Sequence, residues 1–385
     1  MEKETNRQQK FDYTLVFILF LMAIVSCIAI KSAQPTLPAK LQNVNFIGLQ
    51  LRWYVIGIIA VAGTMVIDFD RFKMISWYLY GFGMLLLLGL YLGVPGTTTT
   101  KGATSWYTLP GIGTFQPSEL MKIIMIIVLS KIIVEHREKY PINTVKDDFL
   151  LIGKVLLTSI PPIYLLKEQP DMGMIMVFTA IIASLLIVSG IKWRIILGFL
   201  SAGLVTISIF VYIYFYLPEL FPLRDYQLNR FYGWLKPEEY SSGQGFQLLR
   251  SLLAIGSGEL RGKGYQNSEV SLPEGHTDFI FAVFSEQFGF VGASIVISLF
   301  FLLIYRMIHT ALESHDPFGS YLCAGVIGMI TFQVFQNIGM TIGLLPITGL
   351  PLPFISYGGS SLATYMIAIG IVLNVRSRTK KFMFD

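Results

Sequence analysis

Residues 279–305 read FIFAVFSEQFGFVGASIVISLFFLLIY, with Glu286 as their single charged residue. A helix needs about 20 apolar residues to cross the hydrocarbon core of a bilayer, so this segment is long enough to span one. Nine other apolar stretches predict the same behaviour, and together they indicate an all-α polytopic membrane protein with about ten transmembrane helices. The predicted spans are Thr14–Ile30, Leu49–Ile67, Ile75–Val94, Ser118–Val134, Phe149–Leu166, Met172–Ser189, Ile195–Leu217, Phe279–Tyr305, Phe318–Leu344 and Ser360–Val375.

The composition of the whole chain agrees with this reading. Of its 385 residues, 54% are hydrophobic and 14% are charged, whereas an ordinary soluble domain carries about a quarter charged residues. These values exclude a disordered chain, a disulfide scaffold and nearly all soluble enzymes. Cys27 and Cys323 lie far apart in apolar stretches and are expected to be buried thiols. Residues 1–385 are therefore predicted to form one integral membrane domain.

The distribution of basic residues predicts the orientation. Most of the 29 Lys and Arg residues fall in segments that would lie on the same side as the two termini. Because cytoplasmic loops of membrane proteins collect positive charge, we expect both termini to be cytoplasmic. One long extracellular loop then covers residues 218–277. The net charge of +5 is thus an orientation signal, and no nucleic-acid partner is expected.

Four polar or proline-rich segments interrupt the apolar pattern, and all four fall on the predicted outer side. Independent accidents would distribute between both faces, so the coincidence suggests one polar site built from several helix ends. The segments are Gln116–Lys122, Lys167–Gly173, Leu272–Phe281 and Leu345–Ser361. The predicted substrate-binding residues are Glu119, Lys122, Lys167, Asp171, Arg250, Arg261, Glu274, His276, Thr277, Ser356, Tyr357 and Ser360.

Each segment also has a structural interpretation. Glu119 and Lys122 face the same way on a helix and could neutralise each other, although ionisable residues inside spans are more often functional. Thr277 or Asp278 could cap the helix that follows. Alternatively, Asp278 at the edge of an apolar helix is suited to accept a proton. The glycines between residues 256 and 264 lack the spacing of a nucleotide-binding loop, so no nucleotide is expected.

Three motifs taken together resemble the SEDS family (shape, elongation, division and sporulation proteins), and the resemblance covers nearly the whole chain. They are Phe115–Glu119, Pro273–Val283 and Pro351–Ser361. The proline-rich segment has no Lys after Thr348, which makes it more similar to RodA-type elongation members. One departure concerns residues 102–106, GATSW, where many members carry Arg at the position of Ser105. No role of that Arg is carried over.

The resemblance implies a peptidoglycan glycosyltransferase that polymerises lipid II at the outer face of the bacterial cytoplasmic membrane during cell elongation. Hexosyl transfer would release undecaprenyl pyrophosphate, and Asp278 matches the catalytic aspartate. A divalent cation (Mg²⁺ or Mn²⁺) near Asp278 or Glu119 is expected. The implied partners are a class B penicillin-binding protein, which is a transpeptidase, and other membrane proteins of the elongation complex. A lipid II flippase and a non-catalytic scaffold are the alternatives, and the outward clustering of the motifs favours the enzyme.

Overall fold

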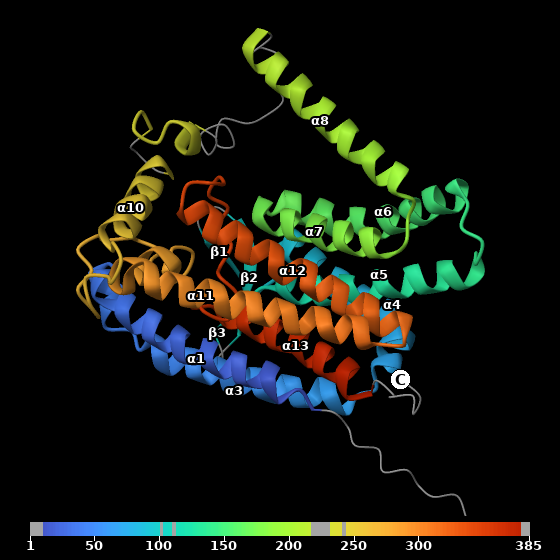
Figure 1. Ribbon diagram of the computed structural model, residues 1–385, viewed down its shortest axis with the longest axis horizontal. Coiled ribbons are helices and arrows are strands. Elements are labelled where there is room, and N and C mark those ends of the chain that lie inside the picture. Colours follow the sequence, from blue (N-terminus) through green and yellow to red (C-terminus); the bar gives the residue numbers. More distant parts are fainter. Residues whose placement is uncertain (1–10, 101–102, 110–112, 217–231, 241–243, 379–385) are drawn as a thin grey trace, which may run out of the picture.

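The computed structural model describes residues 11–100, 103–109, 113–216, 232–240 and 244–378 (Figure 1). Most of this chain is helical. The long helices are α1 (Tyr13–Ala33), α3 (Phe46–Val66), α4 (Phe69–Leu92), α5 (Pro117–Lys139), α6 (Val145–Glu168), α7 (Met172–Val188), α8 (Trp193–Tyr216), α10 (Gln244–Ser257), α11 (Ile280–Glu313), α12 (Pro317–Thr341) and α13 (Gly359–Arg378). The short elements η1 (Gln34–Thr36) and α2 (Ala39–Gln42) join α1 to α3.

Each predicted span corresponds to one of these helices. Within the described residues, 8 helices are long and apolar enough to cross a membrane. The other two predicted spans form α5, which carries charges at both ends, and α7, which has 17 residues. The predominantly helical membrane fold is thus confirmed. The exact number of crossings and the cytoplasmic location of the termini stay predictions.

A small sheet between α4 and α5 was not predicted. Strands β1 (Thr97–Thr100), β2 (Ala103–Leu109) and β3 (Gly113–Phe115) pair antiparallel in the order β1-β2-β3. The Tyr107 hydroxyl donates to the carbonyl of Leu86 at 3.0 Å and fastens the sheet to α4. Because β3 ends one residue before Gln116, the sheet fixes where α5 begins.

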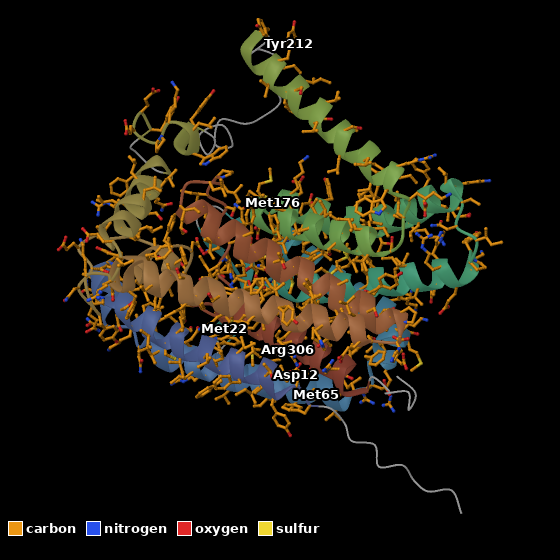
Figure 2. The ribbon with its side chains drawn as sticks, viewed as in Figure 1. Asp12, Met22, Met65, Met176, Tyr212 and Arg306 are labelled. Atoms are coloured by element: carbon orange, nitrogen blue, oxygen red, sulfur yellow. The ribbon has the colours of Figure 1, made fainter. Side chains whose placement is uncertain are left out.

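The two ends of the bundle differ in character. Asp12 and Arg306 form an ion pair of 2.7 Å at the end where both the first and the last described residues lie (Figure 2). Arg378 and Asp68 make a similar pair of 3.0 Å there. Helix α10 lies at the opposite end (Figure 1), which the charge distribution predicts to face outward. We call that end the outer end.

Helix α11 contains a break at Gly289, where φ is 64° and ψ is −162°. Residues 258–264 lie against this break, and the amides of Lys263 and Gly264 donate to the carbonyls of Glu286 and Gln287 at 3.0 Å. The Phe290 amide donates to Glu259 at 2.9 Å. Carbonyls and an amide that the helix leaves unpaired thus find partners in the loop, and the loop after α10 is tied to the transmembrane helix.

Helix α8 stands apart from the other helices. It leads away from the bundle, with Tyr212 near its far end (Figure 2), and little of it is covered by the rest of the chain. Residues 217–231 and 241–243 of the predicted outer loop lie outside the described residues. The remainder of that loop packs on α11 and α12 through buried residues such as Leu248 and Leu272.

We expect Gly289→Ala to destabilise the protein strongly. A Cβ at Gly289 would overlap the amide nitrogen of Gly262, and its φ and ψ lie in a region that is essentially restricted to glycine. The cost should be about 3 kcal/mol or more, seen as a lower unfolding temperature in detergent. Gly153→Ala is the matched control, because a Cβ there meets no atom within 4 Å. Equal unfolding temperatures for the two variants would contradict this account of the break.

Candidate active site

Asp278 lies at the outer end, two residues before α11 begins, and it is partly exposed. Phe279 occupies the N-cap position of α11, and its side chain makes no capping hydrogen bond. Neither Thr277 nor Asp278 occupies the N-cap position of α11. The carboxyl group instead sits at the edge of the bundle, where a substrate from the outer side could reach it.

A tight turn presents Asp278. The carbonyl of Glu274 accepts hydrogen bonds from the amides of Thr277 and Phe279 at 3.2 and 3.1 Å. The Thr277 hydroxyl donates to the Glu274 carboxylate at 3.2 Å. Both Glu274 and Thr277 thus help to shape the turn, and their predicted contacts with substrate stay predictions.

The proline-rich segment forms a non-helical loop against this turn. The Ser356 hydroxyl donates to the Thr277 carbonyl at 2.6 Å and accepts from the Leu352 amide at 2.8 Å. The Tyr357 amide donates to the carbonyl of His276 at 3.0 Å. In this structure Ser356 therefore acts as a crosslink between two of the four predicted segments.

His276 and Tyr357 also meet through their side chains. Their rings stack with centroids 5.8 Å apart, and Phe46 at the start of α3 lies 4.7 Å from the His276 ring. Burial raises the pKa of the Tyr357 hydroxyl, so this group stays protonated and can donate a hydrogen bond. The three rings form an aromatic cluster beside the turn that carries Asp278.

The beginnings of α5, α7 and α13 are joined by polar side chains. Asp171 caps α7 by accepting from the Met174 amide at 3.1 Å, and its second oxygen accepts from the Gln116 side chain at 3.0 Å. The Ser360 hydroxyl accepts from the Gln116 amide at 3.1 Å and donates to the carbonyl of Thr114 at 3.0 Å. Asp171 and Ser360 thus hold three helix starts together.

The proline-rich loop connects this group to Asp278. A Cβ on Gly173 would lie 3.1 Å from the carbonyl of Thr348, so the loop runs against the start of α7. A Cβ on Gly349 would lie 3.5 Å from the Asp278 carboxylate. The structure therefore brings all four predicted segments together at the outer end.

Glu119 and Lys122 lie deeper in the bundle. Their charged groups are 2.7 Å apart, and both side chains are almost fully buried. The Lys122 ammonium also lies 5.1 Å from the Tyr365 ring centre, and the Tyr365 hydroxyl accepts from Gln333 at 2.9 Å. This geometry is the self-neutralised ion pair that the sequence offered as an alternative. Contact of either residue with substrate stays a prediction.

The remaining basic positions lie toward the surface. Lys167 and Arg261 are exposed. Arg250, on α10, donates to the carbonyl of Ser271 at 3.0 Å and packs over the Phe246 ring. None of these three is buried, so each could meet a charged ligand at the outer surface.

The sequence analysis missed Asn337, which lies on α12 and is fully buried. Its side-chain amide donates to the carbonyl of Asp278 at 2.8 Å and to that of Leu350 at 2.7 Å. Gln333 lies four residues before Asn337 on the same helix face, and Gln336 is the residue immediately before Asn337. Three amide side chains at this spacing in an apolar helix were the available signal.

The predicted divalent cation needs ligands from the protein or from solvent. Among the residues that the structure describes, no three His, Cys, Asp or Glu side chains gather in a way that could hold a metal ion. The described residues thus offer no cage built of their own side chains. A cation here would fit only if most of its ligands came from water or from a bound phosphate, as is usual for Mg²⁺.

Comparison with known proteins decides the family. A family model described as "cell cycle protein" (FTSW_RODA_SPOVE) matches residues 12–381. The chain belongs to this family, the SEDS family. Stage V sporulation protein E of Bacillus subtilis is 35% identical to this SEDS chain, covering 96% of the chain and 98% of that protein. Peptidoglycan glycosyltransferase MrdB of Escherichia coli K12 is 33% identical, covering 96% and 94%.

A solved structure shares the fold of this SEDS chain. It is described as "Structural coordination of polymerization and crosslinking by a peptidoglycan synthase complex". The match has a TM-score of 0.78 and 28% sequence identity, and it covers 95% of this chain and 97% of the other. Together with the apolar helices, the family identifies the chain as a multi-pass membrane protein and confirms the resemblance predicted from the three motifs.

We expect Lys122→Met to destabilise the protein by about 3–5 kcal/mol, because it leaves the buried Glu119 carboxylate without its partner. The double variant Glu119→Gln, Lys122→Met removes both charges and should be less destabilised than the single variant. Unfolding temperatures in detergent measure both effects. If the double variant unfolds at a lower temperature than the single one, the pair does not act as a self-neutralised unit.

Proposed function

We propose that this chain is a peptidoglycan glycosyltransferase that polymerises lipid II at the outer face of the bacterial cytoplasmic membrane. The observation that carries the proposal is the position of Asp278, a partly exposed carboxylate where four polar segments meet at the outer end. The Escherichia coli relative, peptidoglycan glycosyltransferase MrdB, supports the same activity by its name.

Asp278 acts as the general base. It takes the proton of the acceptor sugar hydroxyl while the hydroxyl oxygen bonds to the anomeric carbon of the donor sugar. The bond between that carbon and the pyrophosphate oxygen breaks, and undecaprenyl pyrophosphate leaves. Because pyrophosphate is already a good leaving group, no second carboxylic acid is required, in contrast to glycoside hydrolases.

Negative charge that develops on the pyrophosphate needs a positive partner. Arg250, Arg261 and Lys167 are basic residues near the surface of the chain and can supply it. Lys122 is already paired with Glu119. A divalent cation near Asp278 or Glu119 would supply further charge stabilisation.

Sequence identity does not distinguish a role in elongation from one in sporulation, because the relatives of both kinds match the chain at similar identity. The proposed role in elongation therefore rests on the absence of Lys after Thr348. By analogy with the synthase complex of similar fold, the proposed partner is a class B penicillin-binding protein. That transpeptidase would crosslink the new strands together with other membrane proteins of the elongation complex.

Asp278→Asn should abolish polymerisation of purified lipid II by the purified protein with its transpeptidase partner. The amide keeps the size of the side chain but cannot accept the proton, so we expect a loss of about 100-fold or more. Gel analysis of the glycan strands measures it.

Glu238→Gln is the matched control, because Glu238 is an exposed carboxylate of the same outer loop. Wild-type rates in a folded Asp278→Asn variant would overturn the role of Asp278. If the wild type makes no polymer but moves lipid II across liposome membranes, the protein is a flippase instead.

Removal of divalent cations should stop polymerisation without altering the fold. Since the described residues form no metal cage, EDTA should leave the unfolding temperature of the protein alone unchanged. Added Mg²⁺ or Mn²⁺ should restore polymerisation. Full activity in EDTA would contradict the proposed cation, and a lower unfolding temperature in EDTA would show that the protein itself holds a structural metal.

A further inference from the structure

Asn337 makes contacts that the reaction outlined above does not use. The residue lies on α12 with no exposed surface. Its two neighbours at hydrogen-bond distance are both backbone carbonyls, of Asp278 at 2.8 Å and of Leu350 at 2.7 Å. Carbonyls only accept hydrogen bonds, so the NH2 end of the Asn337 amide must face them. Each of its two hydrogens is donated to one carbonyl.

These two carbonyls belong to the two segments that enclose the reactive carboxylate. One is the carbonyl of Asp278 itself. The other is the carbonyl of Leu350, the residue after Gly349. A Cβ placed on Gly349 would lie 3.5 Å from the Asp278 carboxylate. Gly349 has a φ of 76°. Glycine adopts such a positive φ without steric cost, so the loop can turn at this point. Asn337 thus links the main chain of Asp278 to the proline-rich loop. The carboxylate of Asp278 lies beside the same loop.

Losing the Asn337 amide would have an energetic cost. Without the amide, two buried carbonyls lose their hydrogen bonds, and each such loss costs about 1–3 kcal/mol. The start of α11 and the proline-rich loop could then shift relative to each other. A displacement of about 1 Å at a reacting group is enough to cost about 100-fold in rate.

We propose that Asn337 is a positioning residue: its side-chain amide fixes Asp278 against the Gly349–Leu350 peptide and so sets where the carboxylate meets the acceptor hydroxyl. The proposal rests on the proposed function. It predicts that Asn337 governs turnover and the protonation behaviour of Asp278 more than it governs substrate affinity.

Helix α12 provides a matched comparison residue. Gln336 is buried beside Asn337, and its side-chain amide donates to the carbonyl of Pro346 at 3.0 Å. It therefore holds the same proline-rich loop through the same kind of hydrogen bond, but its hydrogen bond goes to Pro346 and not to Asp278. A purely structural role for both residues predicts similar effects when either amide is changed.

The test compares Asn337→Asp with Gln336→Glu in the full-length protein with its transpeptidase partner, using purified lipid II. Both changes replace an amide by an acid of the same size. Asn337→Asp should lower kcat by about 100-fold, with KM changed by less than about threefold, and should shift the acidic limb of the pH–rate profile. Gln336→Glu should keep the wild-type pH profile and lose less than about tenfold in kcat.

Asn337→Ser, a smaller variant that keeps one donor, provides a second measurement if the Asp variant folds poorly. Rates are compared per folded molecule, so a loss of stability alone leaves the pH profile unchanged. The proposal is overturned if folded Asn337 variants keep the wild-type kcat and pH profile, or if Gln336→Glu matches Asn337→Asp in both.

Wild type and Asp278→Asn are run in the same assay. A wild type that makes no polymer refutes the proposed function, and this inference with it. Activity that depends on Asp278 but not on Asn337 refutes the inference alone.

Discussion

A non-helical loop inside a membrane bundle must find partners for its backbone groups, because hydrocarbon offers none. The loop at residues 342–358 meets this requirement through side chains that the surrounding helices send to it. Its carbonyls at Phe354, Ile355 and Ser356 accept from Tyr54, Ser26 and Gln50. Asn337 serves the Leu350 carbonyl from α12. Polar residues in these otherwise apolar helices therefore have a common cause: they hold the loop that faces Asp278.

Three carboxylates of the described residues differ in how deeply they are buried. Glu119 is deep in the bundle and is neutralised by Lys122. Glu286 is fully buried, accepts from the amides of Glu269 and Val270, and lies 3.6 Å from the Lys263 ammonium. Both are held by partners within the protein. Asp278 is partly exposed and lies beside Gly349, which suits the proton-accepting role proposed for it.

The sequence predicted the helices well because apolar length is a strong signal in a membrane protein. It did not predict the sheet before α5 or the break at Gly289, since a run of threonines and one glycine carry little information without their neighbours. The motifs predicted that four segments converge, and the contacts of Ser356 and Asp171 agree with this. They did not reveal Asn337, because its role depends on two carbonyls, one 59 residues away and one 13.

The ion pair between Asp12 and Arg306 joins residues that are 294 positions apart. Ribosomes add about 5–20 residues per second, so about 15 to 60 s pass between the synthesis of the two partners. During that interval the Asp12 carboxylate lacks this partner. The contact that joins the start of α1 to α11 therefore forms only after α11 has been synthesised, which places it among the late contacts of assembly.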